Sequence, residues 1–299
     1  MNRIMKKSIT IFLMLLLSFS LSAKAKKTIV KKIKRTPRTE ESLVSKSIVA
    51  LSPSATEILY AIGAEDQIAA VSEFSDYPPE AAEKPVVGGF DGKTLSIETI
   101  LSYKPDLVYL TDGMHNFLIE PLDEYGIKWY LSKATSIDAI RQEILDIGGL
   151  TGHAIEALAV ATQMEEKLNK IAEYTESTKA SGEDPVSIYY EVWNAPYMSA
   201  GSTSFINDII VHAGAKNIFD DLEDAYPMVS EETIIARAPQ VILLPAGNGF
   251  TADDVKARAG WENIPAVQND RIYVIDDNLY SRPGPRIADV VVDLTELIK

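Results

Sequence analysis

Short apolar runs alternate with helix-like segments along most of the chain. Strand-like runs in the first half cover residues 47–51, 68–72, 107–110 and 129–131. A helical pattern over residues 137–147 follows the last of them. Because strands that alternate with helices usually pair in parallel, this order predicts an α/β fold with mostly parallel sheets covered by helices.

The pattern changes after residue 150. Apolar and small residues recur there at helical spacing without proline, namely Ile155, Leu158, Ala159, Thr162, Leu168 and Ile171. This spacing predicts one long helix over residues 151–178, roughly 35–40 Å in length. A second series of strands at 186–192, 241–244 and 271–275 follows, with helices expected at 204–213 and 287–298.

These patterns divide the chain into parts. We expect an N-terminal α/β lobe over residues 47–150, a rigid connecting helix over 151–180 and a C-terminal α/β lobe over 181–299. Two lobes joined in this way leave a cleft, and loops at strand ends in such clefts usually bind ligands. At the start of the first lobe, the spacing of Ser54 and Glu57 predicts a capping box, and Gly63 is expected to end that helix.

The N-terminus has the pattern of a targeting segment. Basic residues precede an apolar run over residues 9–21, and Ala23-Lys24-Ala25 follows. This predicts a signal peptide over residues 1–25 and a basic, flexible leader over 26–46. The run is shorter than the roughly 20 residues that span a bilayer. The chain contains no cysteine, so we expect an exported, periplasmic protein that is not a lipoprotein.

Charge separates the leader from the rest of the chain. The net charge is −14, but residues 1–38 hold 11 of the 29 basic residues and none of the 43 acidic ones. The remainder therefore has a net charge of −25, which argues against nucleic-acid binding.

An internal repeat provides the sharpest clue. Residues 96–110 and 230–244 are identical at six of fifteen positions, at an offset of 134 residues. Each copy places a glutamate, Glu98 or Glu232, two residues after a serine that can cap a helix. A carboxylate in the first turn stabilises the helix dipole, yet matched positions in two lobes favour a shared function.

Several segments of the chain resemble a known family. Segments 49–59, 75–81, 95–108, 226–232 and 285–287 are similar to periplasmic substrate-binding proteins of ABC importers for cobalamin, haem and ferric siderophores. The similarity is greatest to the cobalamin-binding proteins. It implies two α/β lobes joined by one helix, no catalytic residues and no catalytic cofactor. It also implies that Glu98 and Glu232 dock onto arginines of an inner-membrane permease and ATPase complex.

The resemblance implies a corrinoid, cobalamin or a relative, as the transported ligand. The aromatic candidates for its contacts are Tyr77, Phe90 and Tyr226, in loops rich in glycine and proline, and Trp193 after the first strand of the second lobe. The family often has tryptophan where this chain has Phe90 and Tyr226, which leaves another tetrapyrrole open. Arg282 is expected to donate to polar groups of the ligand, and Arg286 either to do the same or to pair with an acid.

Three alternatives follow from the same residues. Haem or a ferric siderophore could be the ligand, with a tyrosine or His115 on the iron. A tetrapyrrole chelatase would use His115 as its base, and an adhesive protein would bind none of these ligands. His115, His153 and His212 lack the spacing of a metal site, and no G-x-S-x-G, P-loop or G-x-G-x-x-G motif is present.

Overall fold

The computed structural model describes residues 44–89, 93–180, 182 and 184–299. The predicted signal peptide, most of the basic leader and Phe90 lie outside these residues. Within the described part of the chain, no helix combines the length and apolarity needed to cross a bilayer.

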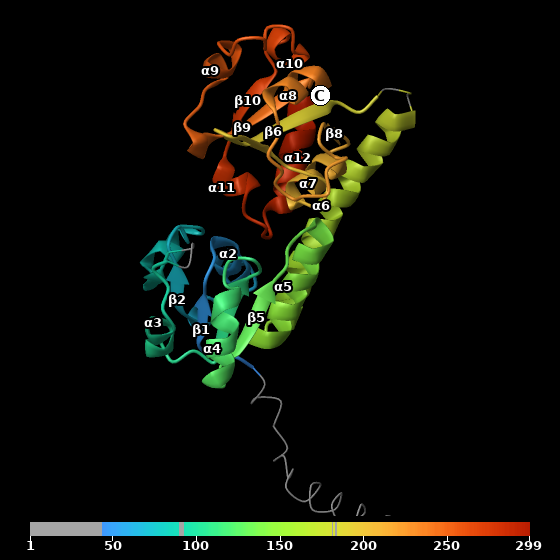
Figure 1. Cartoon of the computed structure of the whole chain (residues 1–299). Helices are drawn as coiled ribbons and strands as arrows, with labels where there is room; N and C mark the ends of the chain where they lie inside the picture. The colour runs from blue at the N-terminus through green and yellow to red at the C-terminus, as the bar shows by residue number, and fades with distance from the viewer. Residues whose placement is uncertain (1–43, 90–92, 181, 183) are drawn as a thin grey trace, which may run out of the picture. The chain divides into compact units, whose positions relative to one another are not determined.

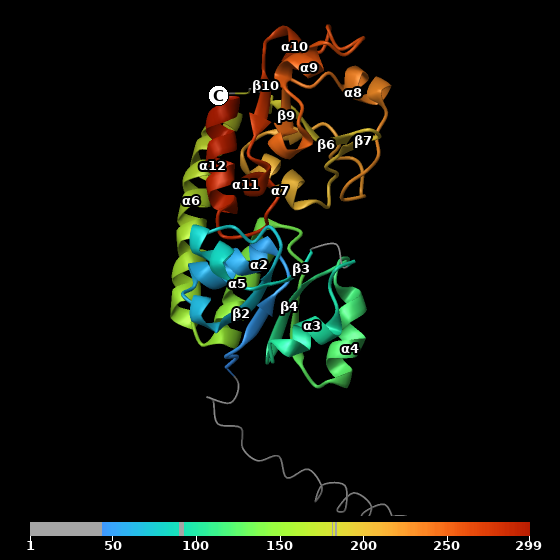
Figure 2. The ribbon, with the colours of Figure 1, turned by 90° about the vertical axis from the view of Figure 1, so that its left-hand side faces the viewer.

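The N-terminal lobe contains a parallel sheet of five strands in the order β3-β2-β1-β4-β5. Figure 2 labels β2, β3 and β4 of this sheet. The strands are β1 (Ile48–Ala50), β2 (Ile68–Ser72), β3 (Val86–Gly88), β4 (Leu107–Thr111) and β5 (Lys128–Ser132). The helices of this lobe are α2 (Pro53–Ala61), α3 (Ile97–Ser102), α4 (Ile119–Glu124) and α5 (Ile137–Thr151).

Both faces of this sheet are buried, as the apolar runs predict. In β1, Ile48 and Ala50 join the core that includes helix α5 and residues of the helix that follows it, whereas Val49 packs into a second cluster on the opposite face. Successive side chains of a strand point to opposite faces, so one run of apolar residues serves both clusters.

The C-terminal lobe contains a second sheet in the order β10-β9-β6-β7, with β8 also pairing with β6. Its pairs are parallel except β6 with β7. The strands are β6 (Ser187–Asn194), β7 (Tyr197–Ser199), β8 (Lys216–Asn217), β9 (Val241–Pro245) and β10 (Ile272–Ile275). The helices are α7 (Phe205–His212), α8 (Glu231–Arg237), α9 (Ala252–Lys256), α10 (Pro265–Gln268), α11 (Asp277–Tyr280) and α12 (Ile287–Ile298).

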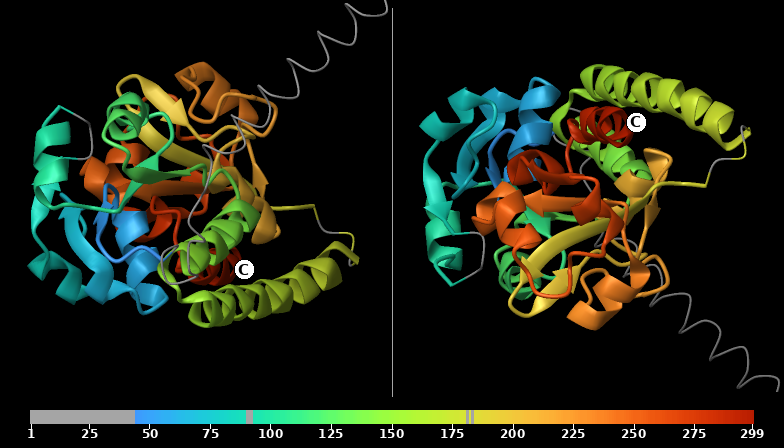
Figure 3. Two further views of the ribbon diagram at one scale, coloured as in Figure 1. Left: turned by 90° about the horizontal axis from the view of Figure 1, so that it is seen from below. Right: turned by 90° about the horizontal axis from the view of Figure 1, so that it is seen from above.

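Helix α6 (Ala154–Ala180) connects the two sheets. Its 27 residues correspond to about 40 Å, and it packs against α5, α7 and α12. Figures 1 and 3 show α12, in red, beside the green α6. The helix begins at Ala154 rather than at residue 151, because Gly152 has a φ of +80° and ends α5 in the left-handed conformation.

The apolar residues that recur at helical spacing in this helix are only partly buried. Ile155 and Leu158 are 81% and 59% exposed, whereas Ala157, Ala161 and Met164 are buried. The buried face is set by the approach of α5, where Gly148 leaves no room for a side chain beside Ala157. Close helix contact thus selects small residues, which a search for large apolar residues overlooks.

Two neighbouring glycines of α5 provide a matched test of this packing. A Cβ at Gly148 would lie 2.3 Å from the Cβ of Ala157, whereas a Cβ at Gly149 meets nothing within 4 Å. Gly148→Ala should therefore lower the free energy of unfolding by about 1–3 kcal/mol through overpacking. Gly149→Ala should raise it by about 0.5–1 kcal/mol, because alanine favours a helix interior. Urea unfolding measures both, and equal effects would contradict the close contact.

Candidate functional site

The two copies of the repeat form two similar helix starts. Ser96 caps α3 by accepting a hydrogen bond from the Thr99 amide at 3.1 Å, and Ser230 caps α8 through the Thr233 amide at 3.2 Å. Glu98 and Glu232 follow the caps and are exposed.

A buried isoleucine anchors each of these helices to its own lobe. Ile100 in α3 and Ile234 in α8 are fully buried, one in a cluster of each lobe. Hydrogen bonds from its own backbone amide and from the Ser230 hydroxyl hold the pKa of Glu232 below its usual value. Glu232 is therefore ionised at neutral pH on the surface of its lobe.

A cavity of about 440 Å³ lies in the C-terminal lobe around Tyr226. Its apolar lining includes Tyr190, Met198 and Phe205, and its polar lining includes Asn248, Asp277 and Ser281. An apolar cavity of this size with a few polar groups has the character of a small-molecule site. Burial raises the pKa of the Tyr226 hydroxyl to about 12, so this group is a neutral hydrogen-bond donor at neutral pH.

Tyr77 lines a different cavity of about 280 Å³, together with Glu57, Tyr60 and Arg286. The guanidinium carbon of Arg286 lies 3.7 Å from the centroid of the Tyr77 ring. The structure thus places Tyr77 and Tyr226 in separate cavities rather than in one.

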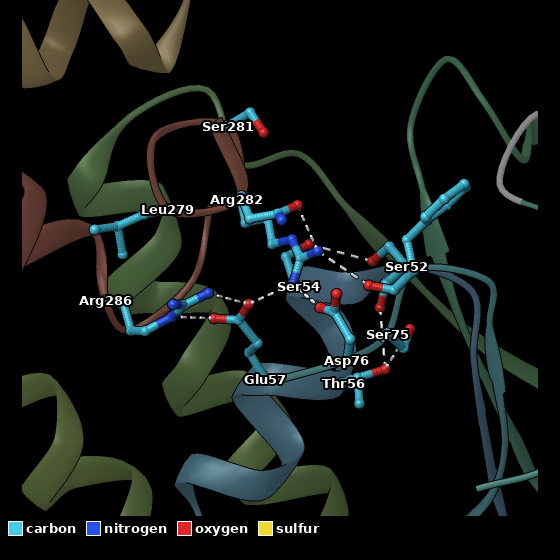
Figure 4. Close-up of polar contacts among 12 residues, drawn as sticks. Ser52, Ser54, Thr56, Glu57, Ser75, Asp76, Leu279, Ser281, Arg282 and Arg286 are labelled. Carbon is cyan, nitrogen blue, oxygen red and sulfur yellow. Dashed lines mark hydrogen bonds and ion pairs between the residues drawn. The ribbon is translucent and has the colours of Figure 1, made fainter. Parts of the chain in front are cut away.

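Arg282 and Arg286 converge on a carboxylate of the other lobe, as Figure 4 shows. Glu57 accepts hydrogen bonds from Arg286 at 2.6 and 2.9 Å and from Arg282 at 3.3 Å. Arg282 also contacts Asp76 at 2.7 Å and the backbone carbonyl of Phe74 at 3.0 Å. We call Glu57, Asp76, Arg282 and Arg286 the interlobe clamp.

The capping box predicted at the start of α2 is wrong. Ser54 and Glu57 do not form a capping box; the cap of α2 is Ser52, whose hydroxyl accepts from the Ala55 amide. The proline at the helix start shifts the cap two residues toward the N-terminus, because proline is favoured in the first helical turn. Glu57 therefore lies in the second turn of the helix rather than the first, and its buried carboxylate meets the two arginines.

Among the described residues, Trp193, Arg282 and His115 do not line the cavity around Tyr226. Trp193 is 45% exposed, and its indole N–H donates to the carbonyl of Ala195 at 3.1 Å. Arg282 is 8% exposed and contacts protein groups. His115 is fully buried, and its Nδ1 accepts from the Thr111 amide at 3.0 Å.

Sequence reasoning missed several residues that line the cavity. Met198 and Phe205 belong to a strand and a helix whose apolar residues are expected in a hydrophobic core. Asn248 belongs to the short helix η5 (Ala246–Asn248) after β9. The position of Asn248 after a parallel strand was an available signal, since loops at such strand ends form ligand sites. Within the described residues, no cluster of three or more histidine, aspartate or glutamate side chains could hold a metal ion.

Comparison with known proteins identifies relatives of this arrangement. Residues 48–279 match the family described as periplasmic binding protein. The vitamin B12-binding protein of Vibrio cholerae serotype O1 is 30% identical over 258 residues, covering 84% of this chain and 88% of that protein.

Two solved structures are similar to this fold. The periplasmic vitamin B12 binding protein of Vibrio cholerae has a TM-score of 0.73 at 29% identity, covering 85% of this chain and 96% of that one. A possible iron-binding, periplasmic solute-binding protein from Staphylococcus epidermidis has a TM-score of 0.72 at 31% identity, covering 85% and 98%.

Proposed function

Because this chain belongs to the periplasmic binding protein family, we propose that it captures a corrinoid, cobalamin or a close relative, for an ABC importer. The observation that carries the proposal is the cavity around Tyr226 in a chain 30% identical to a vitamin B12-binding protein. The sequence of residues 1–25 supports export by a signal peptide, and the family supports a role in binding rather than catalysis.

The lining of the cavity favours a ligand with neutral polar groups. Its polar contacts come from Asn248, Ser281 and Tyr226, and the one charged side chain among its lining residues is the carboxylate of Asp277. A corrinoid carries neutral amides around an apolar disc, which these groups can match by hydrogen bonds. The carboxylates of haem would meet no cation among the same residues.

The iron alternatives have less support from the side chains. Haem capture uses an axial histidine or tyrosine, but His115 is buried and its Nδ1 already accepts a hydrogen bond. The burial of His115 likewise weighs against its use as the base of a chelatase. The Staphylococcus relative keeps a ferric siderophore as the second candidate.

Glu98 and Glu232 are proposed to dock the loaded protein onto basic residues of the permease. Two exposed carboxylates, one on each lobe, can fix orientation and speed encounter with a basic partner. The aromatic contacts proposed for the ligand are Tyr226 in its cavity, with Tyr77, Phe90 and Trp193 as further candidates. For Arg282 we propose an indirect role, in which the clamp holds the end of helix α11, which carries Asp277 and is followed by Ser281.

A thermal-shift panel with cyanocobalamin, cobinamide, haem and a ferric siderophore tests the ligand class. At 100 times its Kd, the true ligand should add about 2.7 kcal/mol of stability, which raises the Tm by about 5 °C. We expect the corrinoids to do so and the iron compounds not to. Stabilisation by haem or the siderophore alone would contradict the proposal.

A further inference from the structure

The first turns of the two docking helices, residues 97–100 and 231–234, differ at one position. The residue after the capping serine is Ile97 in the first copy of the repeat and Glu231 in the second. Ile97 packs against an apolar cluster of the N-terminal lobe. The carboxylate of Glu231 accepts hydrogen bonds from the indole N–H of Trp261 at 2.8 Å and from the Tyr197 hydroxyl at 3.2 Å. Directional bonds therefore hold the first turn of α8, whereas apolar contact holds that of α3.

These bonds continue into the lobe. Trp261 is fully buried, and the guanidinium carbon of Arg258 lies 4.6 Å from the centroid of its ring. Arg258 in turn forms two hydrogen bonds with Glu191 of β6, at 2.5 and 2.8 Å. A bidentate pair of this kind fixes orientation as well as distance. We call Glu191, Arg258, Trp261, Tyr197 and Glu231 the α8 network.

The α8 network reaches the cavity around Tyr226 through β6. The side-chain amide of Asn248 donates to the backbone carbonyls of Glu191 and Val192, at 3.3 and 3.1 Å. Asn248 and Val192 both line the cavity. A ligand that moves Asn248 therefore acts on the strand residue that holds Arg258.

Strand β7 makes a second connection. Met198 lines the cavity, while its neighbour Tyr197 belongs to the α8 network. Successive strand residues point to opposite faces, so β7 lies between the cavity and the α8 network. The carbonyl of Tyr197 also accepts a hydrogen bond from the Val229 amide at 2.9 Å. Val229 immediately precedes Ser230, the cap of α8.

We propose that the α8 network and β7 couple occupancy of this cavity to the first turn of α8, so that Glu232 responds to the ligand and Glu98 does not. The inference rests on the proposed function, because it assigns a regulatory role to one of the two docking glutamates. Glu98 then serves as a constant anchor, and Glu232 reports that the cavity is filled. Trp261 and Glu231 act as positioning residues.

Hydrogen exchange at the two helices tests the coupling. We expect saturating cyanocobalamin to slow exchange in α8 by at least about fivefold, the lower end of typical allosteric coupling, and to leave α3 unchanged. Glu231→Ile gives α8 the residue that α3 has, and it should abolish the ligand-dependent change. An equal response of α3 and α8, or an unchanged response in Glu231→Ile, would overturn the proposal. Calorimetric titration of each variant verifies that cyanocobalamin is bound.

A second arm needs no ligand. Asn248→Ala removes the bonds to β6 and should speed exchange in α8 of the ligand-free protein. Asn269→Ala, at an exposed asparagine elsewhere in the lobe, should not. In the Glu231→Ile background Asn248→Ala should have no further effect, because coupled residues are not additive. Additive effects would overturn the coupling. Failure of cyanocobalamin to bind would instead refute the proposed function, and this arm would still decide the coupling.

Discussion

Replacing both Glu98 and Glu232 by lysine is expected to abolish uptake of the ligand while leaving its affinity for the isolated protein unchanged. Both side chains are exposed at helix starts and lie outside the lining of the cavity around Tyr226. Reversal would set like charges against the basic residues proposed on the permease, which costs several kcal/mol at such an interface. Uptake of radiolabelled cyanocobalamin, in cells that depend on this chain for binding, measures the effect.

The matched control reverses the charge of two other exposed acids, one on each lobe. Glu120 and Asp253 are exposed acids in the first turns of α4 and α9, one on each lobe. Their replacement by lysine changes the net charge equally and should leave uptake intact. Loss of uptake in the control, or loss of ligand binding in the Glu98 and Glu232 variant, would contradict the docking role.

The largest effect on stability is expected at the interlobe clamp. The side chain of Glu57 is 3% exposed and meets two arginines, so Glu57→Gln leaves part of their charge without compensation. Removing one partner of a buried ion pair costs about 3–5 kcal/mol. Because the Arg286 side chain is 23% exposed, we expect a value at the lower end of this range. Urea unfolding measures the loss.

Asp76→Asn provides the matched control for the clamp. Asp76 also contacts Arg282, but its side chain is 57% exposed. Solvent screens an exposed pair, so this substitution should cost at most about 1 kcal/mol. Equal losses in the two variants would show that burial of Glu57 does not set the strength of the clamp.

The fold could largely be predicted from the sequence because most strands are short apolar runs between turn residues. The C-terminal helix α12 (Ile287–Ile298) begins and ends at the predicted residues. Strands β3, β7 and β8 were missed, since each has only two or three residues and at most two adjacent apolar ones. Their pairing depends on neighbouring strands rather than on their own composition.

The functional surface was less predictable than the fold. The repeat gave the two helix starts correctly because capping is local, and a serine three residues before a threonine fixes it in both copies. The clamp joins Glu57 to Arg286 across 229 positions of the chain, and no local pattern specifies such a contact. Tyr77 and Tyr226 have similar loop contexts in the sequence, and only the folded chain assigns them to different cavities.

Calorimetric titration of the purified protein with cyanocobalamin tests the central claim most directly. The account predicts saturable binding of one ligand per chain. Tyr226→Ala should weaken it at least tenfold, as expected when a central aromatic contact is removed. Tyr125→Ala, at a tyrosine that is 61% exposed in the other lobe, should leave it unchanged. Absence of saturable binding, or equal affinity in wild type and Tyr226→Ala, would contradict capture of a corrinoid in this cavity.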